Sequence, residues 1–172
     1  MSDDRPRAPY VGDERTLLTG FLDWHRATLR QKAGGLDAEQ LGRTLPPSDL
    51  TLGGMVKHLA FVEDWWFGAV LQGVQGEPWA SVDWDADDDW DWHSAADDTP
   101  EQLWRLHDDA VRRSDEAVRA SESLDRIAER RTERTDQQIS LRWILVHMIE
   151  EYARHNGHAD LIRQSIDGQV GQ

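Results

Sequence analysis

The sequence predicts an all-α protein that folds as a four-helix bundle, with a long crossover between the second and third helices. Four segments carry apolar residues at helical spacing, and no segment shows a convincing strand pattern. A polar linker at 72–98 separates the second helix from the third. It is long enough to run the length of a helix of about 30 Å, so those two helices can lie parallel.

Length and composition indicate a single folded domain over residues 1–172, with residues 1–12 as a loose N-terminal arm. The formal net charge of −14 argues against binding to nucleic acid or to an anionic membrane surface. The chain has no cysteine, so it offers no disulfide, thiolate ligand or cysteine nucleophile. It also lacks the apolar core of a signal peptide and any apolar run near the ~20 residues of a membrane helix. A cytoplasmic location is therefore expected.

The first helix is expected to begin after the capping residue Asp13 and to stop at Gly34. The second is expected from about Thr51 to Leu71. The predicted apolar faces comprise, in the first helix, Leu17, Leu18, Phe21, Leu22, Trp24, His25, Thr28 and Leu29, and in the second, Met55, Leu59, Val62, Trp66 and Ala69. His58 shares the face of the second helix, since it lies three residues after Met55 and four before Val62. Three charged residues are expected to point elsewhere: Lys57, Glu63 and Asp64.

The linker at 72–98 is acidic and rich in tryptophan. Its alternating aspartates at 83, 85, 87 and 89 mimic the start of a calcium loop. The mimicry fails where such a loop needs glycine and glutamate, because Asp88 and Ser94 stand there. A solvated loop is the preferred interpretation, with Trp84, Trp90 and Trp92 folded back onto the bundle.

The third helix is expected to start at a capping box formed by Thr99 and Gln102, with Pro100 in the first turn, and to end near Ser121. Its predicted buried side consists of Leu103, Leu106, Ala110, Ala117 and Val118. Residues 122–139 are highly charged and expected to be exposed, with a short strand or turn. Ser140 then caps the fourth helix, which ends at Gly168.

The fourth helix carries ionisable residues in its apolar stripe, which consists of Leu141, Ile144, Leu145, Met148, Tyr152, His155, Ala159 and Ile162. Glu151 and His155 are stacked one turn apart on the inner side. Burying a carboxylate is costly unless a cation compensates it. A divalent metal held by His58, Glu151 and His155 would do so, and two histidines with one carboxylate suit zinc, nickel or iron(II).

Each of these residues also has an interpretation without metal. His58 can be a hydrogen-bonded core histidine, and Glu151 can pair with Arg154, His147 or a group of the first helix. His147 and His158 are rival or supporting residues, and His25 can face the same cavity. The two remaining histidines, His93 and His107, are expected in solvated acidic segments.

Three segments resemble the DinB-like superfamily of metal-binding four-helix bundles, in particular its actinobacterial branch related to mycothiol-dependent enzymes. They are DERTLLTGFLDWHR at 13–26, LTLGGMVKHLAFVEDWWF at 50–67 and HMIEEYARHNGHADLIRQSIDG at 147–168. The resemblance implies a metal triad of His58, Glu151 and His155. Many members of the superfamily have histidine where this chain has Glu151, and the mycothiol-related branch uses glutamate.

The resemblance further implies a metal-dependent thiol S-transferase, in which a low-molecular-weight thiol such as mycothiol attacks a small electrophile. The absence of cysteine fits, because the nucleophile would arrive with the thiol. The proposed apolar wall includes Trp65, Tyr152 and the linker tryptophans, and Arg154, His158 and Arg163 are candidates for binding carboxylates. The expected partners are the thiol and the electrophile, with a homodimer as the expected assembly.

Three alternatives remain. The first is a metal-binding stress-response protein without turnover. The second is a structural metal site, which predicts a fourth protein ligand such as His158 or His147. The third, hydrolysis by a metal-bound water, ranks lower because no general base is evident beyond the proposed ligands.

Overall fold

The computed structural model describes residues 5–131 and 136–171, and within them the all-α prediction is confirmed. The described residues contain no strand, only an isolated bridge between Ile127 and Ser140 in the segment expected to hold a strand or turn. Parts of the predicted arm (1–4) and of that segment (132–135) lie outside the described residues. The helices are α1 (Glu14–Ala33), α2 (Ala38–Leu41), α3 (Leu52–Glu63), the π-helix η1 (Asp64–Val70), η2 (Trp79–Ser81), α4 (Trp90–His93), η3 (Ser94–Asp97), α5 (Pro100–Ala120) and α6 (Leu141–Asp167).

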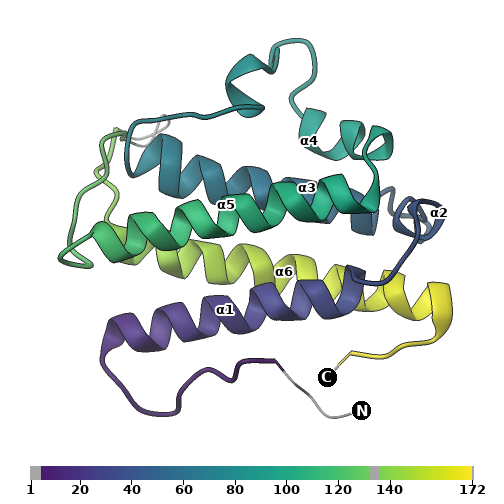
Figure 1. The fold of residues 1–172 in the computed structure, drawn as a ribbon, viewed down its shortest axis with the longest axis horizontal. Helices are drawn as coiled ribbons and strands as arrows, with labels where there is room; N and C mark the ends of the chain where they lie inside the picture. The colour runs from purple at the N-terminus through teal and green to yellow at the C-terminus, as the bar shows by residue number, and fades with distance from the viewer. Residues whose placement is uncertain (1–4, 132–135, 172) are drawn as a thin grey trace.

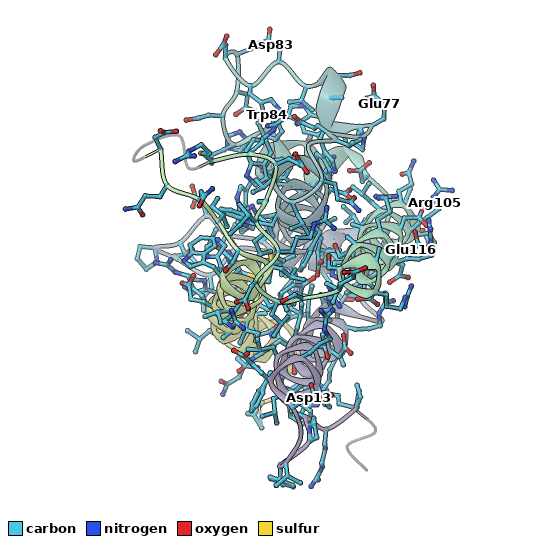
Figure 2. All side chains as sticks on the ribbon, turned by 90° about the vertical axis from the view of Figure 1, so that its left-hand side faces the viewer. Asp13, Glu77, Asp83, Trp84, Arg105 and Glu116 are labelled. Atoms are coloured by element: carbon cyan, nitrogen blue, oxygen red, sulfur yellow. The ribbon has the colours of Figure 1, made fainter. Side chains whose placement is uncertain are left out.

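Four long helices, α1, α3, α5 and α6, lie side by side (Figure 1). Helix α1 packs against α6, α3 packs against α5, and α3 also contacts α6. Figure 1 shows α3 and α5 running in the same direction, with the linker returning over their outer side. In Figure 2, Asp83 and Trp84 of the linker lie at the opposite end of the molecule from Asp13. The linker therefore covers α3 and α5 and leaves α1 on the far side.

The predicted helix starts are confirmed, because each capping side chain accepts a hydrogen bond from the backbone N–H three residues later. These caps are Asp13, Thr51, Thr99 and Ser140. Helix α6 ends at Gly168, whose φ of 79° lies in the left-handed region that glycine adopts without strain. The helix predicted over 51–71 is present, but its hydrogen bonding changes to the wider π pattern from Asp64.

A buried polar network joins the long helices and corrects two predictions. Glu63, expected to point away from the apolar face of its helix, is fully buried and receives two hydrogen bonds from Arg26 of α1, at 2.7 and 2.8 Å. The hydroxyl of Tyr152 on α6 donates to the same carboxylate at 2.9 Å. His107 of α5, expected in solvent, is buried and contacts that hydroxyl at 2.9 Å. Glu63 is inside because a cation and a hydroxyl satisfy it there.

Burial alone would raise the pKa of Glu63, but the paired Arg26 guanidinium outweighs it and holds that pKa below the ordinary 4.5. A carboxyl whose pKa is lower in the folded state than in the unfolded state stabilises the fold above its unfolded pKa. That stabilisation is lost as the pH falls through the folded pKa. The Arg26–Glu63 pair therefore contributes to stability at neutral pH and contributes less in acid.

We expect Glu63→Gln to lower the free energy of unfolding by about 3 kcal/mol at pH 7, because Arg26 stays buried without its charged partner. The difference from the unchanged protein should shrink as the pH falls below 4.5, the ordinary pKa of the carboxyl. Denaturant unfolding at several pH values measures both the loss of stability at pH 7 and its decrease in acid. As the control, Glu116→Gln removes an exposed partner of Arg112 and should change stability by less than about 0.5 kcal/mol. Equal effects of the two substitutions would contradict the role assigned to Glu63.

Candidate metal centre

The three residues predicted as metal ligands come together between α3 and α6. One ligand-type atom from each of His58, Glu151 and His155 lies within 4.8 Å of the other two. Nε2 of His155 is 3.4 Å from Oε2 of Glu151, and the ring centres of His58 and His155 are 4.9 Å apart. Two ligands held about 2.1 Å from one ion at a tetrahedral angle lie about 3.4 Å apart. The spacing of the acid and the imidazole therefore matches that of two ligands of one ion.

Local helical geometry places two of these residues, and packing places the third. Glu151 and His155 are four residues apart on α6, so they project from one face of that helix. His58 lies on α3, between the buried residues Met55 and Leu59, and the α3–α6 contact turns it toward the pair. His155 is buried, while His58 and Glu151 are half-buried, so the cluster lies at the edge of the core.

The charge state of Glu151 suits a cation. A hydrogen bond with His155 holds the pKa of Glu151 below its ordinary value, against the opposing effect of burial. In the described part of the chain its ion-pair partners are only two imidazoles, His147 at 3.5 Å and His155 at 3.4 Å. Nδ1 of His155 is buried and has no hydrogen-bond partner among the described residues. A half-buried carboxylate without an arginine or lysine beside it, next to an unsatisfied imidazole, fits a divalent metal.

His58 has a partner that the sequence did not predict. Its Nδ1 lies 2.7 Å from Oδ2 of Asp91, which comes from α4 in the linker and is 3% exposed. Because an ionised carboxylate only accepts hydrogen bonds, this contact favours the tautomer of His58 with the proton on Nδ1, which leaves Nε2 as the nitrogen able to bind an ion. The sequence signal was weak, since Asp91 is one aspartate among many in the linker.

Comparison with protein families matches residues 17–168 to the mycothiol S-transferases. The chain belongs to the mycothiol S-transferase family. The match covers most of the chain and confirms the resemblance to the mycothiol-related branch of the DinB-like superfamily. A search among curated proteins gave no match. None of the helices in the described ranges is both long enough and apolar enough to cross a membrane.

In this member of the family, His147 forms a second cluster that shares Glu151. Nδ1 of His147 lies 3.3 Å from Glu150, and its ring stacks on Trp143 with centres 4.8 Å apart. Trp66 approaches the same ring edge-on at 4.7 Å. His147, Glu150 and Glu151 could also hold an ion, although Glu150 is exposed. His147 therefore lies close enough to Glu151 to form the alternative pair considered from the sequence, at 3.5 Å between Nε2 and Oε1.

The other site residues predicted from the sequence do not belong to the cluster of His58, Glu151 and His155. His158 lies beside His155, with ring centres 5.8 Å apart, and burial lowers the pKa of His158, which favours its neutral form. His25 on α1 contacts Asn156 instead. Tyr152 was expected to form part of a substrate wall, but it is fully buried in the Glu63 network. Arg163 donates to the carbonyls of Lys32 and Gly34, so its guanidinium is engaged by backbone.

The linker folds back onto the helices, as predicted for its tryptophans. Trp79 is 1% exposed, and Trp84 and Trp90 pack against it at the outer side of α3 and α5. Among the described residues, no candidate ion cluster includes the aspartates of the calcium-like run.

Trp92 stacks on His58 with ring centres 4.5 Å apart. It also lines a cavity of about 370 Å³ together with Leu41, Leu50, Leu103, Asp49 and Asp89.

Trp92 reaches His58 because Gly54, the α3 residue against which its indole packs, has no side chain. A Cβ added to Gly54 would lie 2.8 Å from Cε3 of Trp92, closer than packed atoms tolerate. We expect Gly54→Ala to displace the indole and to destabilise the fold by about 1–3 kcal/mol. Gly157→Ala on α6 is the matched control, since nothing lies within 4 Å of its added Cβ. The control should raise stability by roughly 0.5–1 kcal/mol, and denaturant unfolding distinguishes the two. A stabilising Gly54→Ala would contradict this packing.

Proposed function

We propose that the protein is a divalent-metal-dependent mycothiol S-transferase, built as one domain with four-helix-bundle topology and a crossover between α3 and α5. The observation that carries the proposal is the convergence of His58, Glu151 and His155 in a chain of the mycothiol S-transferase family. These three residues would hold the metal, with zinc or nickel preferred and iron(II) also compatible with the ligand types. When bound, the metal supplies a positive charge that lowers the pKa of a coordinated thiol.

The chain supplies the surroundings and leaves the nucleophile to the cosubstrate. It has no cysteine, so the reacting sulfur belongs to mycothiol. In the proposed reaction this sulfur forms a bond to an electrophilic carbon of the substrate. The thiol proton passes to solvent, and the electron pair of the broken bond leaves with the displaced group. The cavity lined by Trp92, Leu50 and Leu103 is connected to the ligand cluster through Trp92, which stacks on His58, and none of the three ligand residues lines it. Its apolar surface would take the carbon skeleton of an electrophile.

The site residues have distinct proposed roles. Glu151 contributes the negative charge of the ligand set, and its lowered pKa keeps it ionised at neutral pH. His155 and His58 contribute neutral nitrogens from two helices, which fixes the ion between α6 and α3. The buried environment of His155 limits water around the ligands and strengthens their electrostatic interactions.

Replacement of a ligand is expected to remove the metal. We expect tag-free protein to contain about one divalent ion per chain, and His58→Ala, Glu151→Gln and His155→Ala each to lose most of it. Elemental analysis measures the stoichiometry. His147→Ala is the matched control, because it removes a neighbouring imidazole on α6 that also contacts Glu151. Loss of metal in His147→Ala and Glu151→Gln, with the metal retained in His58→Ala and His155→Ala, would instead assign the ion to the second cluster.

Catalysis is expected to need both the metal and the thiol. We expect metal-loaded protein to consume mycothiol in the presence of a suitable electrophile from a broad panel. A chelator should abolish the reaction, and addition of zinc or nickel should restore it, because the free thiol is mostly protonated at neutral pH. Measuring thiol loss and the conjugate product checks this. No consumption above the metal-free control across the panel would favour a metal-binding protein without turnover.

A further inference from the structure

Three consecutive linker residues contact two consecutive residues of α3. Trp90, Asp91 and Trp92 form the first three positions of the short helix α4. The ammonium of Lys57 lies 4.4 Å from the ring centre of Trp90, Asp91 bonds to Nδ1 of His58, and Trp92 stacks on the His58 ring. We call residues 90–92 the linker clamp. It brings a segment more than thirty residues away in sequence onto the candidate ligand.

Asp91 is a buried carboxylate whose contact with His58 explains its burial. It is 3% exposed, in a linker whose other aspartates are mostly in solvent. Burial of an unpaired carboxylate is unfavourable, so Asp91 stays inside because it accepts the Nδ1 proton of His58 at 2.7 Å. The same hydrogen bond limits rotation of the imidazole and selects the tautomer with a free Nε2.

Trp92 restrains the same ring from its face. The two ring planes are inclined by 23° with centres 4.5 Å apart, and Trp92 also approaches His155 at 5.4 Å. Asp91 holds the edge of the His58 ring and Trp92 covers its face. Together they leave the side-chain torsions of His58 little freedom. Lys57 anchors the clamp, since its buried ammonium also pairs with Asp98 at 2.5 Å.

We infer that the linker clamp belongs to the metal centre: Asp91 is a positioning residue that orients His58, and metal binding is coupled to docking of the linker. The inference rests on the proposed metal site. A clamp that fixes His58 before the ion arrives removes part of the ordering that binding would otherwise require. By thermodynamic reciprocity, the bound ion then favours the docked linker by the same coupling free energy.

The test is zinc affinity, measured on the whole protein by competition with a chromophoric chelator. We expect Asp91→Ala to weaken zinc binding by about 10- to 100-fold. Asp91→Asn should retain most of the affinity, because its amide oxygen still accepts the Nδ1 proton. Asp87→Ala is the matched control: it removes a similar aspartate–histidine contact, to His93, from an exposed part of the same linker. It should leave zinc affinity unchanged.

Two further measurements separate positioning from general stability. Nitrogen-15 NMR of the histidines in metal-free protein, with His58 assigned through His58→Gln, should show the Nδ1–H tautomer, and this signature should be lost in Asp91→Ala. Zinc should slow chymotrypsin cleavage within 72–98, which contains several tryptophans, and should slow it less in Asp91→Ala. The NMR result in the unchanged protein does not depend on whether Asp91→Ala folds.

The outcomes are distinguishable. Wild-type zinc affinity in folded Asp91→Ala, or an Nε2–H tautomer of His58 in the unchanged protein, would overturn the positioning role of Asp91. Equal protection of the linker by zinc in both proteins would overturn the coupling. Absence of zinc binding by the unchanged protein would instead overturn the metal site itself. Zinc binding with no thiol transfer would overturn only the proposed enzymatic activity and would leave the clamp in place.

Discussion

The buried carboxylate of Glu63 is the group on which the packing of the long helices depends. It lies on α3 and receives hydrogen bonds from Arg26 of α1 and Tyr152 of α6, while His107 of α5 reaches it through the tyrosine hydroxyl. A charge can remain in a core only when these partners satisfy it. The network therefore sets the relative rotations of the four helices as well as their stability, because these polar atoms meet only when the helices are correctly rotated.

That constraint extends to the candidate metal centre. Tyr152 fixes the rotation of α6 about its axis by pointing at Glu63. Neighbouring residues on a helix project about 100° apart, so Glu151 lies to one side of the core and His155 follows one turn later on the same side. His58 is five residues before Glu63 on α3. The network that places Glu63 beside Tyr152 therefore also sets how far along α6 His58 lies. A change in core packing would separate the ligands even if none of them were replaced.

The linker has two physically different parts. Its outer aspartates are solvated and account for much of the negative charge, whereas Asp91 and Trp92 are drawn inward to His58. Long connections that carry no core of their own often contribute to sites, because a rigid scaffold can position their side chains. Here the linker packs on α3 through Trp79 and the glycine at position 54, which makes room for an indole beside the imidazole.

The sequence by itself determined the helix starts and stops, most of the inward faces and the spacing of Glu151 and His155 on one side of α6, although Phe21, predicted to face inward, is exposed. Capping chemistry and helical periodicity are local, so a single segment contains the information. Only the tertiary structure decided that Glu63 and His107 are buried, that Tyr152 belongs to the core and that Asp91 holds His58. Those outcomes depend on partners far apart in the chain, since a charged residue is buried or exposed according to whether another segment satisfies it.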